Sequence, residues 1–324
     1  MCTSIALTTG DFYFGRNLDL EYTFGEQVAV TPRQYPFVFR KAGECGRHHA
    51  MIGMATVVDG YPLYAEAANE KGLCIAGLNF PDNAFYPAQL CEDKVNVSPF
   101  ELPLWVLGQC AGVEEARALL ERTHIVAIPF SDRMPLAPLH WHIADRERSI
   151  VVECMRDGMR IYDNPVGVLT NNPPFDFQMT NLRQYMALRS GEPENSLAAG
   201  LELAPFGRGF GAIGLPGDFS PVSRFVKAAF LRCNAVCEGE ESSSVSQIFH
   251  LLDAVAMPRG AVRAGDLWDI TTYSCCINAS KGVYYYKTYD NSQITAVDMR
   301  REDLEDSQVR SFALETGLRI AHAN

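Results

Sequence analysis

The chain has 324 residues, of which 47% are hydrophobic and 21% charged, a balance typical of a soluble protein with a sizeable core. Its formal net charge of −11 argues against a nucleic acid partner, because phosphate binding requires clustered Lys and Arg and the chain has no such cluster. No apolar run of about 18 residues predicts a membrane span, and the first residues lack the basic stretch and apolar core of a secretory signal, so we expect a cytoplasmic protein.

The opening third of the chain is predicted to be rich in strands. Residues 4–16 indicate a β-hairpin, since apolar and polar residues alternate on either side of a turn at Thr9-Gly10-Asp11. Two further strands are expected at 27–31, which ends before a proline, and at 50–58, which is followed by the turn Asp59-Gly60.

Helices and short strands are expected to alternate through the rest of the chain. The three-to-four spacing of apolar residues predicts a helical pair over 100–122. Short strands follow, and we expect them to form an antiparallel meander at 140–144, 149–154, 159–162 and 167–170. Further helices are predicted at 176–188, 222–232 and 245–255, with a polar link at 238–244. Strands resume at 271–278, 282–287 and 293–298.

These elements predict one α+β domain over residues 1–324, with sheets covered by helices. No repeat, low-complexity tract or Pro/Ser-rich linker divides the chain. The glycines in 207–217 mark a loop between two helices, because the strand and immediate helix of a dinucleotide-binding unit do not flank them.

The second residue is a cysteine, and its position suggests a catalytic nucleophile. A small side chain after Met1 favours enzymatic removal of the initiator, which leaves a thiol and a free α-amine together on Cys2. An α-amine titrates at about pH 7.7–8.0 in reference peptides, so it can take the thiol proton without a histidine partner. The alternative is a small buried hydrophobe at the start of a strand, which position alone favours.

Two charged residues stand at the end of the returning hairpin strand, which runs back towards Cys2. The positive charge of Arg16 would favour a thiolate, and the carboxylate of Asp19 would accept from the amine or the thiol. From the residues alone, a surface ion pair between Arg16 and Asp19 is the commoner explanation.

The remaining cysteines and the histidines carry no recognisable site. All ten cysteines are scattered, so we expect free thiols, and neither disulfides nor a metal or other cofactor is predicted. His140, His142 and His250 are each candidates for the base of a Cys-His protease. His140 and His142 also share one face of a strand, so that pair could bind a metal. No protease signature surrounds them, so we assign them no role.

Several separated motifs resemble, in the same order, those of the choloylglycine hydrolase family, which contains bile salt hydrolases and penicillin V acylases. They extend over nearly the whole chain and comprise Met1-Cys2-Thr3, Phe14-Gly15-Arg16-Asn17-Leu18-Asp19, Asn69-Glu70-Lys71-Gly72-Leu73, Ala76-Gly77-Leu78-Asn79-Phe80-Pro81, Val168-Leu169-Thr170-Asn171, Phe175-Asp176-Phe177, Asn181-Leu182 and Gly214-Leu215-Pro216-Gly217-Asp218-Phe219-Ser220-Pro221-Val222-Ser223-Arg224-Phe225.

The resemblance implies a four-layer αββα N-terminal-nucleophile hydrolase fold, usually assembled as a homotetramer. It also implies a catalytic set made of the nucleophile Cys2, its neighbours Arg16 and Asp19, the residues near the oxyanion Asn79 and Asn171, and the supporting Arg224. Preorganised amide donors suit an oxyanion. Judged from the residues alone, both asparagines are equally well explained as turn residues before prolines.

Within the family, Asn79 in its Leu-Asn-Phe-Pro context resembles bile salt hydrolases, whereas many penicillin V acylases carry Tyr there. The implied substrate is a bile acid joined to glycine or taurine by an amide, cleaved through a Cys2 thioester. A rigid steroid needs an apolar concavity, and the resemblance places its lining at Leu18, Tyr22, Phe24, Val58, Ala65, Phe130, Met134 and Leu139.

Two other functions remain open from the sequence. The first is penicillin V acylase activity at the same nucleophile. The second is a non-catalytic steroid or fatty-acid binding protein, which would result if Met1 stayed in place and blocked the amine of Cys2.

Overall fold

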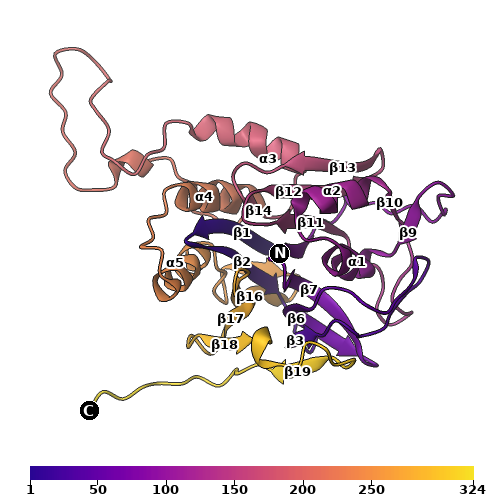
Figure 1. The fold of residues 1–324 in the computed structure, drawn as a ribbon. Coiled ribbons are helices and arrows are strands. Elements are labelled where there is room, and N and C mark those ends of the chain that lie inside the picture. The colour runs from indigo at the N-terminus through magenta and orange to yellow at the C-terminus, as the bar shows by residue number, and fades with distance from the viewer.

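The computed structural model describes residues 1–324 and contains two large antiparallel sheets (Figure 1). The first has seven strands in the order β14-β1-β2-β16-β17-β18, with β15 also paired to β16. Their bounds are β1 Cys2–Thr9, β2 Asp11–Leu20, β14 Val168–Leu169, β15 Val262–Ala264, β16 Leu267–Asn278, β17 Val283–Thr288 and β18 Thr295–Asp298.

The second sheet has eight strands in the order β13-β12-β11-β8-β7-β6-β3-β19. Their bounds are β3 Gln27–Thr31, β6 Met51–Val58, β7 Tyr61–Asn69, β8 Cys74–Asn79, β11 Leu139–Ala144, β12 Ser149–Met155, β13 Gly158–Asp163 and β19 Arg310–Ala313. Two small additional sheets are formed by β4 Phe37–Phe39 with β5 Gly43–Cys45, and by β9 Val95–Val97 with β10 Thr123–Ile125.

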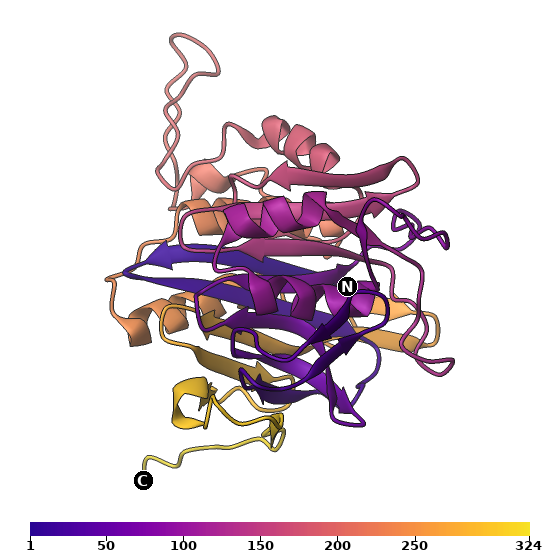
Figure 2. The ribbon, with the colours of Figure 1, turned by 45° about the vertical axis from the view of Figure 1, so that its right-hand side comes forward.

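Helices cover the outer face of each sheet, which gives four layers (Figure 2). Helices α4 and α5 pack on β1, β2 and β16, whereas α1 packs on β7 and β8. Their bounds are α1 Leu102–Gln109, α2 Val113–Glu121, α3 Phe175–Leu182, α4 Pro221–Cys233 and α5 Glu241–Asp253. The chain therefore has the α+β, αββα fold that the sequence predicted.

The strand β2 shows why the layers are stacked in this way. Its eight residues from Phe12 to Asp19 are all buried, since one face meets the second sheet and the other meets the helices. Charged side chains on such a strand lie in the interior, where they require partners. Arg16 and Asp19 are the charged residues among these eight, so the exposed surface ion pair is wrong for both.

Most elements lie where the sequence predicts them, including the first hairpin, the helical pair and the strand at Gln27–Thr31. The predicted four-strand meander is wrong in its last member, because β14 leaves the second sheet and pairs with β1. The predicted polar link at 238–244 is also partly wrong, since α5 begins at Glu241. The sequence patterns did not reveal strands β4, β5, β7, β8, β9, β10, β15 and β19.

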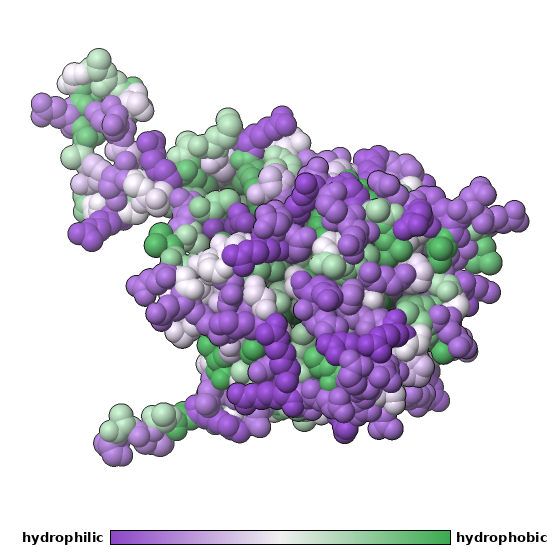
Figure 3. All heavy atoms as spheres, in the orientation of Figure 1, coloured by the Kyte–Doolittle hydropathy of each residue, from purple (hydrophilic) through white to green (hydrophobic).

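A long arm projects from the body between α3 and α4 (Figure 1). We define the arm as residues 191–209, all of which are exposed except the half-buried Pro193. Hydrophobic residues stand among hydrophilic ones along it (Figure 3), and four of them are Leu197, Leu201, Leu203 and Phe206. The C-terminal residues also extend away from the body. None of the helices combines the length and the apolar character that crossing a bilayer would demand.

Close packing between β6 and β7 generates the first prediction. A Cβ atom added at Gly53 would lie 2.1 Å from the carbonyl oxygen of Glu66 and 2.6 Å from the Cα of Ala67. We expect Gly53→Ala to lower the free energy of unfolding by about 1–3 kcal/mol through overpacking. Urea unfolding measures this, with Gly46→Ala as the control because a Cβ there meets no atom within 4 Å. Unfolding of Gly53→Ala at the wild-type midpoint would contradict the packing.

Candidate active site

The register of the first hairpin brings Cys2 and Arg16 together. Cys2 lies opposite Leu18 and Ser4 lies opposite Arg16, so the side chains of Cys2 and Arg16 share one face of the sheet. The Nη2 of Arg16 lies 3.1 Å from Cys2 Sγ, and both residues are buried. A fixed guanidinium charge at this distance favours the thiolate, which is the reactive form of cysteine.

Arg16 is held in place by a buried carboxylate on the facing sheet. Its Nη1 donates to Glu66 Oε2 at 2.8 Å and to the carbonyl oxygen of Ala65 at 2.7 Å. Glu66 also accepts from the hydroxyls of Tyr273, at 2.8 Å, and Tyr284, at 2.5 Å. Burial and the charge of Glu66 raise the pKa of Tyr273, so this hydroxyl stays protonated and donates. Burial lowers the pKa of Arg16, but the charges of Cys2 and Glu66 raise it by more, so the pKa lies above its usual value.

The backbone nitrogen of Cys2 is fixed from another direction by Asn171. This nitrogen donates to Asn171 Oδ1 at 2.9 Å, and the same oxygen accepts from Arg224 Nη2 at 2.7 Å. The Nδ2 of Asn171 donates to the carbonyl oxygen of Asn79 at 2.7 Å. Since both donors require an acceptor, the orientation of the Asn171 carboxamide is determined by its neighbours. Asn79 is half-buried, and its carboxamide forms no hydrogen bond within the chain.

Arg224 ties the start of α4 to the first strand. Ser220 caps this helix by accepting from the amide of Ser223, and Arg224 follows in the first turn. The guanidinium donates to the carbonyl oxygen of Cys2 at 2.5 Å and to Thr3 Oγ1 at 2.7 Å. Burial lowers the pKa of Arg224, and the opposing charge of Asp19 limits this effect.

Asp19 lies beneath the N-terminus. Its Oδ1 accepts from Thr271 Oγ1 at 2.6 Å, and its Oδ2 lies 3.9 Å from Arg224 Nη1 without a hydrogen bond. Burial raises the pKa of this carboxyl, and Arg224 counteracts it. Met1 is present in the structure: its amine donates to the carbonyl oxygen of Asp19 and lies 3.4 Å from Asp269 Oδ2.

All the predicted catalytic positions therefore meet around the N-terminus, within one network of contacts: Cys2, Arg16, Asp19, Asn79, Asn171 and Arg224. Three further residues of this network, Glu66, Thr271 and Tyr273, are not predicted from the sequence. A signal existed for Glu66, because it is a carboxylate within the otherwise apolar run Ala65–Ala68 of β7, although a bulge at Ala65 turns it to the opposite face of the sheet from Tyr64. A carboxylate at such a position implies a buried cationic partner.

The predicted acyl-binding residues are only partly gathered. Phe130, Met134 and Leu139 line an apolar cavity of about 170 Å³ together with residues that include Leu63 and Phe100. The five other predicted residues lie outside this cavity, and one of them is the half-buried Phe24. Leu18 is buried opposite Cys2, Ala65 and Val58 are half-buried on the second sheet, and Tyr22 is 56% exposed.

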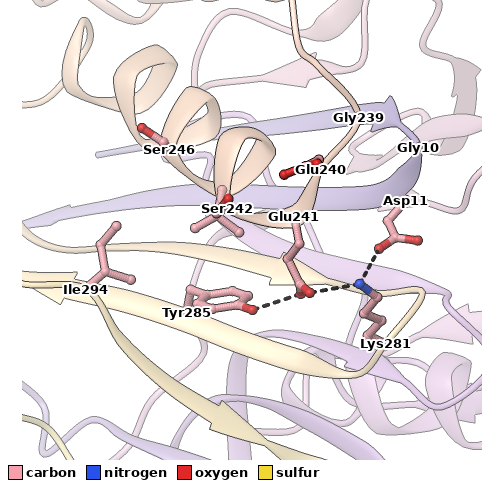
Figure 4. A pocket seen from close by; sticks show the side chains of 11 residues that line it. Gly10, Asp11, Gly239, Glu240, Glu241, Ser242, Ser246, Lys281, Tyr285 and Ile294 are labelled. Atoms are coloured by element: carbon pink, nitrogen blue, oxygen red, sulfur yellow. Dashed lines mark hydrogen bonds and ion pairs between the residues drawn. The ribbon is translucent and has the colours of Figure 1, made fainter.

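A larger surface hollow of about 890 Å³ lies elsewhere, between the first hairpin turn and the start of α5 (Figure 4). Its one basic residue is paired with two of its three acidic residues: Lys281 Nζ lies 2.8 Å from Glu241 and 3.3 Å from Asp11. Glu241 also accepts from the hydroxyl of Tyr285 at 2.8 Å. None of the predicted catalytic residues lines this hollow.

Comparison with known proteins gives a consistent picture. The profile of linear amide C-N hydrolases, choloylglycine hydrolase family, matches residues 2–312. The chain is 48% identical over 317 residues to a bile salt hydrolase/transferase of Lactiplantibacillus plantarum, covering 98% of each chain. A solved mutant structure of conjugated bile acid hydrolase from Clostridium perfringens superposes with a TM-score of 0.93 at 40% identity, over the full length of each. Penicillin V acylase from Agrobacterium tumefaciens has a TM-score of 0.75 at 20% identity, covering 97% of this chain and 92% of the other, which shows the shared fold.

The support of Arg16 by Glu66 generates the second prediction. Glu66→Gln keeps the side-chain shape but leaves a buried guanidinium without its counter-charge, so we expect a loss of about 3–5 kcal/mol in the free energy of unfolding. The matched control is Glu114→Gln, which breaks an exposed ion pair with Arg148 and should cost less than about 1 kcal/mol. Urea unfolding of the two variants is the measurement. Equal losses in both would show that Glu66 does not stabilise the buried charge.

Proposed function

Because the chain belongs to the choloylglycine hydrolase family of linear amide C–N hydrolases, we propose that it cleaves the amide between a bile acid and glycine or taurine. The observation that carries this proposal is the buried thiol of Cys2, with Arg16 on its sulfur and Asn171 on its nitrogen. Relatives named for bile salt or bile acid hydrolysis, which match over nearly their full length, support the choice of substrate.

The first half of the reaction uses both groups of Cys2. Once Met1 is removed, the nitrogen of Cys2 is a free α-amine, and it takes the proton of the thiol. The thiolate attacks the amide carbonyl and forms a C–S bond. The C–N bond then breaks, the amine returns its proton to the leaving nitrogen, and glycine or taurine departs from a bile-acyl thioester.

The second half restores the enzyme. The amine takes a proton from water, and the resulting hydroxide attacks the thioester carbonyl. The C–S bond breaks, the sulfur recovers a proton, and the free bile acid leaves. Both halves pass through an oxyanion, for which a preorganised amide donor is worth about 100 to 1,000-fold in rate.

The two asparagines divide the work in this proposal. The carboxamide of Asn79 is free of hydrogen bonds within the chain, so it is available to donate to the oxyanion. Both polar atoms of the Asn171 carboxamide are already engaged, and its oxygen accepts from the nitrogen of Cys2. We therefore assign Asn171 to the orientation of the amine, while the second hydrogen of its Nδ2 stays available to the oxyanion.

The three charged residues complete the proposed machinery. Arg16 favours the thiolate through its contact with Cys2 Sγ. Arg224 donates to the carbonyl oxygen of Cys2 and to Asn171 Oδ1, and these two contacts fix the orientation of the amine. Asp19 places negative charge below the N-terminus, where it stabilises the protonated amine.

We assign the acyl side to Leu18, Val58, Ala65, Phe130 and Met134. Leu18 lies directly across the strand pair from Cys2, while Phe130 and Met134 line the apolar cavity. The guanidinium of Arg40 lies 5.6 Å from the Phe130 ring and donates to its carbonyl oxygen at 2.8 Å, which holds this loop against the body. An apolar wall with few polar groups suits a steroid acid.

A second activity follows from the same thioester. An amine that attacks in place of water would form a new amide and release the thiol, which is an acyl transfer. The relatives from Lactiplantibacillus plantarum and Clostridium perfringens are named hydrolase/transferase, so we include transfer in the proposal. For penicillin V acylase activity the support is weaker, since the likeness at 20% identity concerns the fold.

We also propose that the enzyme is a homotetramer working in the cytoplasm, as the sequence predicts. The arm supports self-association, because it carries Leu201, Leu203 and Phe206 in exposed positions, with Phe206 94% exposed. Apolar residues displayed on a projecting segment are typical of an interaction surface. A second copy of the chain is the occupant we assign to it.

The substrate assignment generates the third prediction. Met-free protein should release glycine or taurine from conjugated bile salts faster than it releases phenoxyacetic acid from penicillin V at matched enzyme concentration. Cys2→Ser should lose nearly all turnover yet still bind the bile salt, because a hydroxyl is far less ionised than a thiol near neutral pH. Cys233→Ser, at an exposed thiol, is the control and should retain activity. Greater turnover of penicillin V would favour the acylase function, and full activity of Cys2→Ser would refute the thioester.

The assembly proposal generates the fourth prediction. Phe206→Asp places a charge on the arm and should shift the protein from tetramer towards smaller species in light scattering coupled to size exclusion. Val38→Asp, which changes a 60% exposed residue on β4, is the control and should remain tetrameric. A wild-type protein that elutes as a monomer would contradict the assembly.

A further inference from the structure

A buried acid–base pair lies behind the two asparagines of the active site. His140 on β11 and Glu153 on β12 are both fully buried, and His140 Nδ1 lies 3.0 Å from Glu153 Oε1. They belong to the second sheet, where β11 pairs with β12 on one side and with β8, which ends at Asn79, on the other. Neither residue contacts Cys2, Arg16 or Arg224 through a hydrogen bond.

This pair reaches the segment that carries Asn171 at two points. His140 Nε2 lies 3.0 Å from the carbonyl oxygen of Thr170, the residue immediately before Asn171. Glu153 Oε1 accepts from the amide of Phe175 at 3.0 Å, at the start of α3. The Asn171 loop is therefore anchored at both of its ends by this one buried pair.

The same pair also reaches the segment that carries Asn79. The ring of His140 stacks on that of Phe80, the residue immediately after Asn79, with centroids 4.2 Å apart and planes 5° from parallel. In addition, Asn172 Nδ2 donates to the carbonyl oxygen of Pro81 at 2.5 Å, so the two loops contact each other directly. A change in the position of His140 would thus move both loops relative to each other.

The hydrogen bonds determine how many protons the pair holds. Both ring nitrogens of His140 face oxygens, the carbonyl of Thr170 and the carboxyl of Glu153. A neutral imidazole donates from one nitrogen only. Either His140 is an imidazolium facing a carboxylate, or a neutral ring receives the proton of Glu153. In both forms the pair is electrically neutral as a unit and needs both members.

His142 shows the contrast two residues further along the same strand face. It is equally buried, but its nitrogens lie 2.8 Å from Ser4 Oγ and 2.7 Å from Ser149 Oγ, hydroxyls that can donate or accept. Burial lowers the pKa of His142 to about 3, so this ring is neutral. It touches neither asparagine loop, which makes it a matched control for His140.

We propose that His140 and Glu153 are positioning residues that set the spacing between the Asn79 and Asn171 loops, and thereby the alignment of oxyanion donor and amine in the proposed hydrolysis. The inference rests on the proposed function for its substrate, but its geometry does not depend on which amide is cleaved. A misplacement of about 1 Å in reacting groups costs on the order of 100-fold in rate.

Stability and positioning can be separated because a buried ion pair can be replaced as a unit. Removing one member leaves a buried charge or an unmatched proton, whereas exchanging both members for apolar residues of similar size is often neutral. His140→Phe with Glu153→Met keeps an aromatic ring beside Phe80 and removes the bonds to Thr170 and Phe175. A purely structural pair would be replaced by this double variant without loss of activity.

The test measures kcat and KM of Met-free wild type, the double variant and His142→Phe on glycine- and taurine-conjugated bile salts, at a temperature where circular dichroism shows all three folded. We expect kcat of the double variant to fall about 10 to 100-fold while KM changes little, and kcat of His142→Phe to stay near the wild-type value. Should the double variant fail to fold, His140→Gln and His142→Gln carry the same comparison.

Two results overturn the positioning role: wild-type kcat in the double variant, or an equal loss in the variants of His140 and His142. A wild type that turns over neither conjugate would refute the proposed function instead. The positioning role is then tested by alkylation of Cys2 with iodoacetamide, which requires no substrate. Slower alkylation in the double variant than in His142→Phe supports the role, and equal rates overturn it.

Discussion

The site depends on one buried guanidinium shared between a thiol and a carboxylate. Arg16 lies between Cys2 Sγ, at 3.1 Å, and Glu66 Oε2, at 2.8 Å, with almost no exposure to water. A charge in such a place is costly unless each direction is satisfied. The hydroxyls of Tyr273 and Tyr284 therefore converge on Glu66 from the facing strands and donate to its carboxyl oxygens opposite Arg16.

The stacking of the two sheets makes the buried contact between Arg16 and Glu66 possible, and this contact in turn stabilises the stacking. Cys2 lies on β1 and Arg16 on β2 of the first sheet, whereas Glu66 lies on β7 of the second. The ion pair thus crosses the interface between the two sheets and fixes their relative position beside the thiol. The nitrogen of Cys2 is fixed separately, through Asn171 and Arg224, so that the sulfur and the nitrogen of one residue are oriented by independent contacts.

The sequence revealed local features and ordered motifs better than it revealed contacts between distant strands. Alternation and the Gly10 turn predicted the hairpin that aligns Cys2 with Arg16, and the separated motifs identified the residues that converge there. The sequence pattern alone did not show that β14 pairs with β1, because this pairing joins residues that lie far apart in the chain, such as Ser4 and Leu169. For the same reason the sequence predicts no role for His140, because its partner Glu153 and its contact at Thr170 become neighbours only in the folded protein.

The central claim is that Cys2, freed of Met1, carries the acyl group between the two halves of the reaction. The amine of Met1 contacts Asp19 in the structure, and its departure would leave the nitrogen of Cys2, which lies 2.9 Å from Asn171 Oδ1, as the free amine. The most direct measurement is peptide mass mapping of enzyme quenched in acid during turnover of a conjugated bile salt. We predict an N-terminal peptide that begins at Cys2 and carries the bile-acyl mass. An acyl group on another residue, or Met1 still attached in enzyme that turns over, would contradict the account.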